Sequence, residues 1–153
     1  MSQFTIGLIS DTHGLLRAEV YTHFEGCDLI LHAGDLGSPE VLDELRTIAP
    51  TTAVRGNVDT ERWAQKLRFT EQIELGDWSI HLLHDLNQLQ TPHESTNIIV
   101  YGHSHQFAAK NENGIWFINP GSAGPRRFLL PVTIAIMTLK GNQLHLEKIK
   151  LKA

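Results

Sequence analysis

The first third of the chain alternates short apolar runs with segments of helical spacing, which predicts strands and helices in turn. Apolar and branched residues fill 4–9, 28–31 and 51–54, as expected for buried parallel strands. Between them, residues 15–24 and the segment from Ser38 to Pro50 carry apolar residues at the period of an α-helix. A strand-helix-strand-helix-strand order implies parallel strands joined by right-handed crossovers.

The rest of the chain predicts mainly strands, without a repeat, a linker or a low-complexity tract. Alternating apolar residues and Gly-containing turns predict three hairpins and one buried strand, namely 69–75 with 78–83, 97–100, 106–110 with 115–118, and 132–139 with 143–151. Short helices or loops are expected at 60–66 and 86–93. The whole chain, residues 1–153, is therefore predicted to form one domain of mixed α/β class.

Polar residues directly follow five of the predicted strands. They are Asp11 with His13, Asp35, Asn57, His84, and His103 with His105. Open α/β sheets build their sites at the carboxyl ends of strands, so we expect these side chains to meet. Carboxylate, amide and imidazole ligands without a thiolate suit Mn, Fe, Zn or Ni. Seven ligands exceed the needs of one tetrahedral ion, which predicts two divalent ions that share a carboxylate.

The composition narrows the classes of function. The 153 residues include 13 Lys and Arg against 17 Asp and Glu, a net charge of −4, which disfavours a nucleic-acid partner. Cys27 is the only cysteine, so an internal disulfide is excluded. No apolar run approaches the roughly 20 residues of a membrane span, and the first strand pattern has no basic leader before it. We therefore expect a cytoplasmic protein without a membrane partner.

The ordered set of strand-end motifs resembles a known signature. The motifs are Asp11-Thr12-His13, Gly34-Asp35, Gly56-Asn57, the strand-end His84, and Gly102-His103-Ser104-His105. In this order they resemble the calcineurin-like metallophosphoesterase superfamily. The short length and the segment Asn119-Pro120-Gly121-Ser122 are most similar to its small YfcE-type phosphodiesterases. The resemblance implies a β-sandwich of two sheets flanked by helices, with the metals at the strand ends.

The resemblance also implies a role for each motif residue. Asp35 would bridge two divalent ions, with Mn expected ahead of Zn, Fe or Ni. The first ion would be completed by Asp11, His13 and His105, and the second by Asn57, His84 and His103. Asp35, Asn57 and His103 would be the catalytic residues. A hydroxide between the ions would attack the phosphorus of a small phosphoester in line with the leaving oxygen, with diesters expected ahead of monoesters.

Two positions depart from the family pattern. Val58 stands where many larger members carry a histidine that assists the leaving group, so we expect a preference for activated leaving groups. Asp85 follows His84, where the family usually has Gly or Asn, and could repel anionic substrates or orient His84. The alternative function is a non-catalytic scaffold resembling the retromer subunit Vps29. The intact set of seven ligand positions favours the enzyme.

Several neighbouring residues have two interpretations. His32 could support the ligands or be purely structural, and Asp59 is expected to cap the following segment rather than orient Asn57. Ser122 is expected to close a turn rather than donate to phosphate. The pair Arg126-Arg127 could clamp phosphate or be solvated. Predicted exposed strands and the Trp residues suggest a homo-oligomer.

Overall fold

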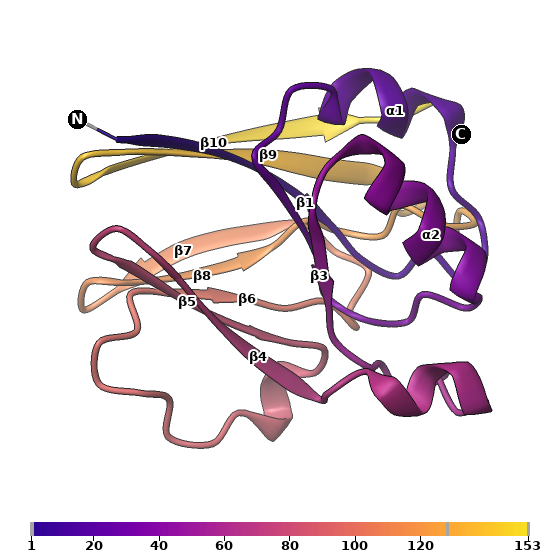
Figure 1. The fold of residues 1–153 in the computed structure, drawn as a ribbon, viewed down its shortest axis with the longest axis horizontal. Coiled ribbons are helices and arrows are strands. Elements are labelled where there is room, and N and C mark those ends of the chain that lie inside the picture. Colours follow the sequence, from indigo (N-terminus) through magenta and orange to yellow (C-terminus); the bar gives the residue numbers. More distant parts are fainter. Residues whose placement is uncertain (1, 128, 153) are drawn as a thin grey trace.

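The computed structural model of the chain describes residues 2–127 and 129–152, which form two five-stranded sheets packed face to face (Figure 1). The first sheet contains β1 (Gln3–Ile9), β2 (Leu29–His32), β3 (Thr51–Ala53), β9 (Thr133–Lys140) and β10 (Gln143–Lys150), in the order β10-β9-β1-β2-β3. The second contains β4 (Thr70–Leu75), β5 (Trp78–Leu83), β6 (Ile98–Val100), β7 (Ala108–Glu112) and β8 (Ile115–Asn119), in the order β4-β5-β6-β8-β7. The predicted two-sheet architecture is confirmed.

The predicted parallel crossovers are present in the first sheet. β1 pairs with β2, and β2 with β3, in parallel, and the connections carry α1 (Ala18–Phe24) and α2 (Pro39–Ile48). α1 begins three residues later than the sequence pattern predicts. The backbone of Leu15 closes a turn with the carbonyl of Thr12, and Arg17 is extended, with its guanidinium on the carbonyls of Ala123 and Gly124. The segment before α1 therefore belongs to the loop that follows β1.

β1 separates two apolar layers. Ile6 and Leu8 face the second sheet and pack in a cluster with residues such as Ile80 and Met137. Ile9 faces the helices and belongs to the other cluster, and Figure 1 shows α1 and α2 on this outer side of the first sheet. This alternation is the period of a strand that is buried on both faces.

Two short 3₁₀ helices lie in the two segments for which the sequence predicted either a short helix or a loop. They are η1 (Arg62–Lys66), which leads into β4, and η2 (Leu86–Gln88), which follows β5. Within the described residues, no helix is both long and apolar enough to span a membrane.

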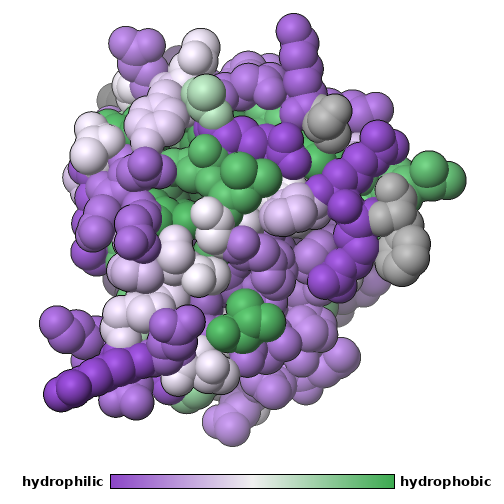
Figure 2. Space-filling view, turned by 90° about the vertical axis from the view of Figure 1, so that its right-hand side faces the viewer, coloured by the Kyte–Doolittle hydropathy of each residue, from purple (hydrophilic) through white to green (hydrophobic). Residues whose placement is uncertain are grey.

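The loops that follow the parallel strands gather where the edges of the two sheets meet. β1, β2 and β3 run in one direction, and β5, β6 and β8 are also parallel to one another. The face on the right of Figure 1 is mostly hydrophilic in Figure 2, with one apolar area in the upper half and a few single apolar side chains. The large apolar residues with the most exposed side chains are Leu15, Tyr21, Val58, Phe69 and Leu129.

Candidate metal centre

The backbone of the strand-end loops is unusual. In the described ranges, six residues other than glycine have a positive φ, and five of them are predicted ligands: Asp11 (55°), His13 (47°), Asp35 (59°), His103 (75°) and His105 (63°). The sixth is in a hairpin turn. Non-glycine residues rarely adopt this conformation, and those that do cluster at functional sites. The backbone of these loops is therefore strained at the residues whose side chains point into the site.

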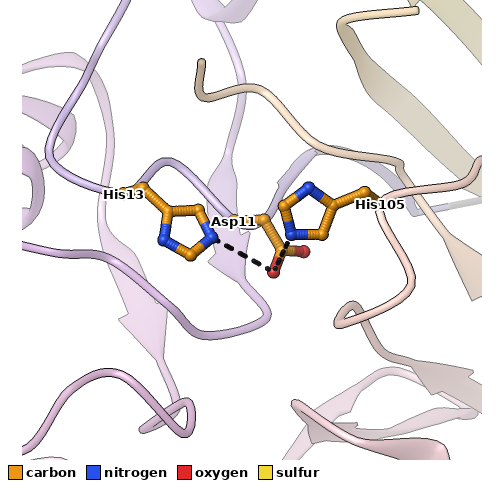
Figure 3. A group of neighbouring side chains, drawn as sticks. All are labelled: Asp11, His13 and His105. Atoms are coloured by element: carbon orange, nitrogen blue, oxygen red, sulfur yellow. Dashed lines mark ion pairs between the residues drawn. The ribbon is translucent and has the colours of Figure 1, made fainter. Parts of the chain in front are cut away.

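The first group of side chains is Asp11, His13 and His105 (Figure 3). The Oδ1 atom of Asp11 lies 3.4 Å from Nε2 of His105 and 4.0 Å from Nε2 of His13. Its Oδ2 atom is already used, because it accepts hydrogen bonds from Ser10 Oγ (2.7 Å) and from the backbone N–H of His103 (3.1 Å). Among the described residues, three buried side-chain atoms have no hydrogen-bond partner: Asp11 Oδ1, His13 Nε2 and His105 Nδ1. The first two face each other in this group and are atoms that a cation would need.

The second group joins Asp11 to Asp35 and His84. Asp35 Oδ2 lies 3.2 Å from Nε2 of His84 and 3.8 Å from Nε2 of His13, so this carboxylate lies between the two groups. Nδ1 of His84 is 2.8 Å from the carbonyl oxygen of Ala33. Because a carbonyl can only accept, Nδ1 carries the proton, and the Nε2 lone pair of neutral His84 is free to bind a metal.

The carboxylates and imidazoles of the site shift one another's pKa values. Burial alone would raise the pKa of Asp11 and Asp35, but the neighbouring imidazoles, chiefly His105 for Asp11 and His84 for Asp35, lower both pKa values. Burial alone would lower the pKa of His84, but the nearby carboxylates of Asp35 and Asp11 raise it. Both carboxylates are therefore ionised at neutral pH, as metal ligands must be.

The last two predicted ligands are more exposed. His103 lies at the rim with Nδ1 3.3 Å from Nε2 of His84, and the two rings meet edge to face. Asn57 is exposed. Its neighbour Gly56 lies so close to Asp35 that an added Cβ would be 2.1 Å from Oδ1 of Asp35. On the other side of Asn57, the N–H of Val58 donates to the same oxygen at 3.0 Å. The fold thus brings six of the seven predicted side chains together and puts the backbone of the seventh beside Asp35.

The comparison with known families decides the classification. Residues 4–142 match the calcineurin-like phosphoesterase superfamily domain. The chain belongs to this superfamily. The resemblance inferred from the strand-end motifs is therefore confirmed.

Two curated relatives of this chain come from archaea. A probable metallophosphoesterase of Methanothermobacter thermautotrophicus is 33% identical over 159 residues, which cover 95% of this chain and 91% of the relative. A protein named phosphodiesterase from Methanocaldococcus jannaschii is 27% identical over 136 residues, or 76% of this chain and 82% of the relative.

Solved structures of two kinds share the fold. YfcE, a phosphoesterase from E. coli, has 24% identity and a TM-score of 0.69 over 92% of this chain and 90% of its own. Vps29 of Chaetomium thermophilum has 19% identity and a TM-score of 0.78 over 96% of each chain. At these identities the likeness concerns the fold, which an enzyme and a Vps29 protein both use.

Asp59 lies beside the candidate metal centre in a role that the sequence did not predict. It does not cap the following segment, because the N-cap of η1 is Glu61. The buried Asp59 carboxylate instead accepts backbone N–H groups from Leu36 (3.2 Å), Gly37 (3.0 Å) and Gly56 (2.9 Å). It joins the loop after β2 to the loop after β3. The sequence feature that could have predicted this role is a carboxylate close to loop glycines, because the N–H groups of such glycines need hydrogen-bond acceptors.

His32 is structural and also supports the site. It is fully buried, and the N–H of Gly34 donates to its Nδ1 atom at 3.1 Å. Nε2 therefore carries the proton and donates to Thr12 Oγ1 at 3.0 Å, and Thr12 donates to the carbonyl of Leu36 at 2.9 Å. Burial lowers the pKa of His32 to about 4, which keeps the ring neutral. His32 therefore connects the loops that carry Asp11 and Asp35 through Thr12 and the backbone of Gly34, and it is buried rather than solvated.

The remaining neighbours divide into three cases. Ser122 closes a turn as predicted, because its hydroxyl accepts the N–H of Gly124 at 3.4 Å. The same hydroxyl donates to the backbone carbonyl of Asp11 at 3.1 Å. Asp85 accepts the N–H of Asn87 at 3.0 Å and caps η2, whereas Nδ1 of His84 is held by the carbonyl of Ala33. The alternative that Asp85 orients His84 is therefore wrong, and its effect on anionic substrates stays a prediction. Arg126 and Arg127 are exposed, and their role as a phosphate clamp stays a prediction.

Proposed function

We propose that this phosphoesterase hydrolyses phosphodiesters at a centre of two divalent cations. One observation carries the proposal. Asp11 Oδ1, buried and without a hydrogen-bond partner among the described residues, lies within 4.0 Å of the Nε2 atoms of three histidines, His13, His84 and His105. Without a cation, gathering these lone pairs around one carboxylate oxygen would cost desolvation energy.

The side chains sort into two ligand sets around Asp35. We assign Asp11, His13 and His105 to one ion, and Asn57, His84 and His103 to the other, with Asp35 shared. Two ligands of a tetrahedral ion with bonds of 2.0–2.1 Å lie roughly 3.4 Å apart, close to the separations of 3.2–4.0 Å between the carboxylate oxygens and the ring nitrogens. The oxygen and nitrogen donors suit Mn, and also Zn, Fe or Ni.

The burial of each side chain indicates its role in the proposed reaction. Two divalent ions, when bound, supply an activated water and neutralise charge on the phosphoryl oxygens. The buried Asp11 and Asp35 carboxylates would hold them, and the carbonyl of Ala33 places the proton of neutral His84 on Nδ1, so that Nε2 could bind a metal. Asn57 and His103 are exposed at the rim, so their side chains can also contact the substrate. This supports the assignment of Asp35, Asn57 and His103 as catalytic residues.

The preference for diesters rests on Val58 and on the relatives. Val58 is 44% exposed at the rim, and its aliphatic side chain offers no proton to a leaving group. An enzyme of this kind is expected to favour esters with activated leaving groups. A curated relative from Methanocaldococcus jannaschii is named phosphodiesterase, which supports diesters over monoesters.

The test is hydrolysis of an aryl phosphodiester by metal-stripped protein after addition of Mn, Ni or Zn. We expect activity to return with metal, and His84→Ala to lower kcat at least about 100-fold at saturating metal. His145→Ala, on an exposed position of β10, is the matched control and should retain full activity. A second metal equivalent per chain, measured by calorimetry, tests the dinuclear assignment directly.

The alternative is a scaffold that binds metal without turnover, as the shared fold with Vps29 proteins allows. It predicts full metal occupancy with no hydrolysis of diesters or monoesters under any metal. The scaffold function would also require an apolar docking area for a partner protein. Full metal occupancy without hydrolysis would overturn the proposed activity but not the assignment of the metal ligands.

A further inference from the structure

A groove of about 640 Å³ adjoins the proposed metal centre at His84. Its other walls include Arg55, Phe69, His81, Gln88 and Gln90. The volume falls within the roughly 300–1,000 Å³ typical of small-molecule sites. A substituent of a phosphoester held at the metal centre can therefore extend into this groove.

Arg55 is fixed in one orientation in the groove. Its Nε atom donates to the carbonyl of Leu67 at 3.3 Å, and its Nη2 atom donates to the carbonyls of Leu67 (3.0 Å) and Gln65 (3.1 Å). Within the described part of the chain, no carboxylate lies at ion-pair distance from this guanidinium. Its charge is therefore available to an anionic ligand, two residues before Asn57 in the loop that follows β3.

The Phe69 ring forms a stacking platform with Arg55. The guanidinium carbon of Arg55 lies 4.4 Å from the ring centroid, and Phe69 is 61% exposed. One face of the ring is thus covered by a planar cation, and the ring still presents a large area to solvent. Aromatic rings and guanidinium planes are the groups on which nucleobases stack in proteins.

We propose that this groove binds a planar aromatic substituent of the substrate, such as a nucleobase, stacked on Phe69. This inference rests on the proposed function and names the substrate class, aromatic phosphodiesters. The ring would stack on Phe69, and the amides of Gln88 and Gln90 at the wall would meet its polar edge. Arg55 would hold Phe69 from behind and attract the phosphoryl charge.

The test compares ligands that differ only in the aromatic group. Calorimetry on the Mn-loaded protein gives the Kd of AMP and of ribose 5-phosphate, which lacks only the base. Phenyl phosphate against methyl phosphate forms a second pair without a ribose. We expect AMP to bind about tenfold or more tightly than ribose 5-phosphate. A gain for AMP alone identifies a nucleoside, and a gain in both pairs a simple aromatic ring; either supports the proposal.

Variants of Phe69 connect the preference to the groove. Phe69→Ala should reduce the ratio of the two Kd values to near one, and Phe69→Trp should keep it. Tyr21→Ala, another exposed aromatic residue, on α1, is the control and should leave the ratio unchanged. Equal affinities for AMP and ribose 5-phosphate in the unaltered protein, or a ratio that survives Phe69→Ala, would overturn the proposal. Failure of the metal centre would appear separately, as absent Mn binding or absent hydrolysis.

Discussion

The two sheets contribute to the metal centre in different ways. The loops of the first sheet are bonded to one another through their backbones. Asp11 N–H donates to the carbonyl of Gly34 at 3.0 Å, and His13 N–H donates to that of Asp35 at 3.0 Å. The loops of the second sheet, which carry His84, His103 and His105, touch the first sheet mainly through their ligand side chains and the backbone of His103.

This difference shows which interactions hold each group of side chains in place. Neighbouring parallel strands place their loops side by side, so hydrogen bonds can connect them directly. The histidines of the second sheet reach the carboxylates across the sandwich, where apolar layers that include Leu8 and Ile80 hold the sheets together and few hydrogen bonds connect the loops. One half of the site is therefore built by local bonding, and the other half by packing at a distance. The following predictions separate these two contributions.

The largest effect is expected at Asp59, which connects the loops of the first sheet. Asp59→Ala leaves three N–H groups without their acceptor, and two of these hydrogen bonds, from Leu36 and Gly56, are buried. We expect the free energy of unfolding to fall by about 3–5 kcal/mol, measured by urea denaturation. Asp43→Ala, at an exposed position of α2, is the control and should change it by less than about 0.5 kcal/mol. A loss below about 1 kcal/mol for Asp59→Ala would show that the loops hold each other without this carboxylate.

The next effect concerns pH and His32. The unfolded chain protonates this ring near its ordinary pKa of 6.5, whereas the folded protein protonates it only near 4. The unfolded state therefore binds more protons between these values, and stability falls as the pH drops from 6.5 to about 4. The loss from this group is about 3 kcal/mol. Denaturation of the metal-stripped protein across this range should show a steeper decline for the unaltered chain than for His32→Gln. Parallel pH profiles for the two proteins would contradict the prediction.

The contact between the two halves can be altered at Gly34. Its φ is +100°, and an added Cβ would lie 2.7 Å from Nδ1 of His84. Gly114 has a similar φ of +87°, but nothing lies within 4 Å of an added Cβ, so Gly114→Ala isolates the backbone strain. We expect Gly114→Ala to cost about 1 kcal/mol. Gly34→Ala should cost more and also weaken metal binding about tenfold or more, measured by calorimetry. Equal metal affinities in both variants would mean that His84 does not need this close approach.

The smallest effect on stability, with a distinct effect on activity, is expected at Val58. Because its side chain is 44% exposed, Val58→His should change the free energy of unfolding by less than about 0.5 kcal/mol. A histidine at this rim position would offer a proton to the leaving oxygen. The rate for a phenyl ester should then rise about tenfold relative to a p-nitrophenyl ester. Val58→Gln controls for polarity, and a ratio of rates unchanged by Val58→His would argue against a missing proton donor.

The sequence predicted much of this molecule because the relevant signals are local. In the described part of the chain, the apolar periods located the ten strands and both α-helices to within a few residues. The strand-end positions of Asp11, Asp35 and His84 predicted that these side chains meet, as they do, since parallel strands end at a common edge. The start of α1 was predicted too early, because Arg17 is held by carbonyls more than a hundred residues away, and no local pattern records such a contact.

By itself, the sequence determined the order of strands and helices and the chemical type of the ligands, because periodicity and side-chain chemistry are properties of neighbouring residues. Only the tertiary structure decided that Asp11 turns one oxygen to three histidines, that Asp59 joins two loops, and that Arg55 stacks on Phe69. These arrangements depend on how two sheets pack and on which N–H groups the packing leaves to be satisfied. Such quantities are set by contacts between distant segments of the chain.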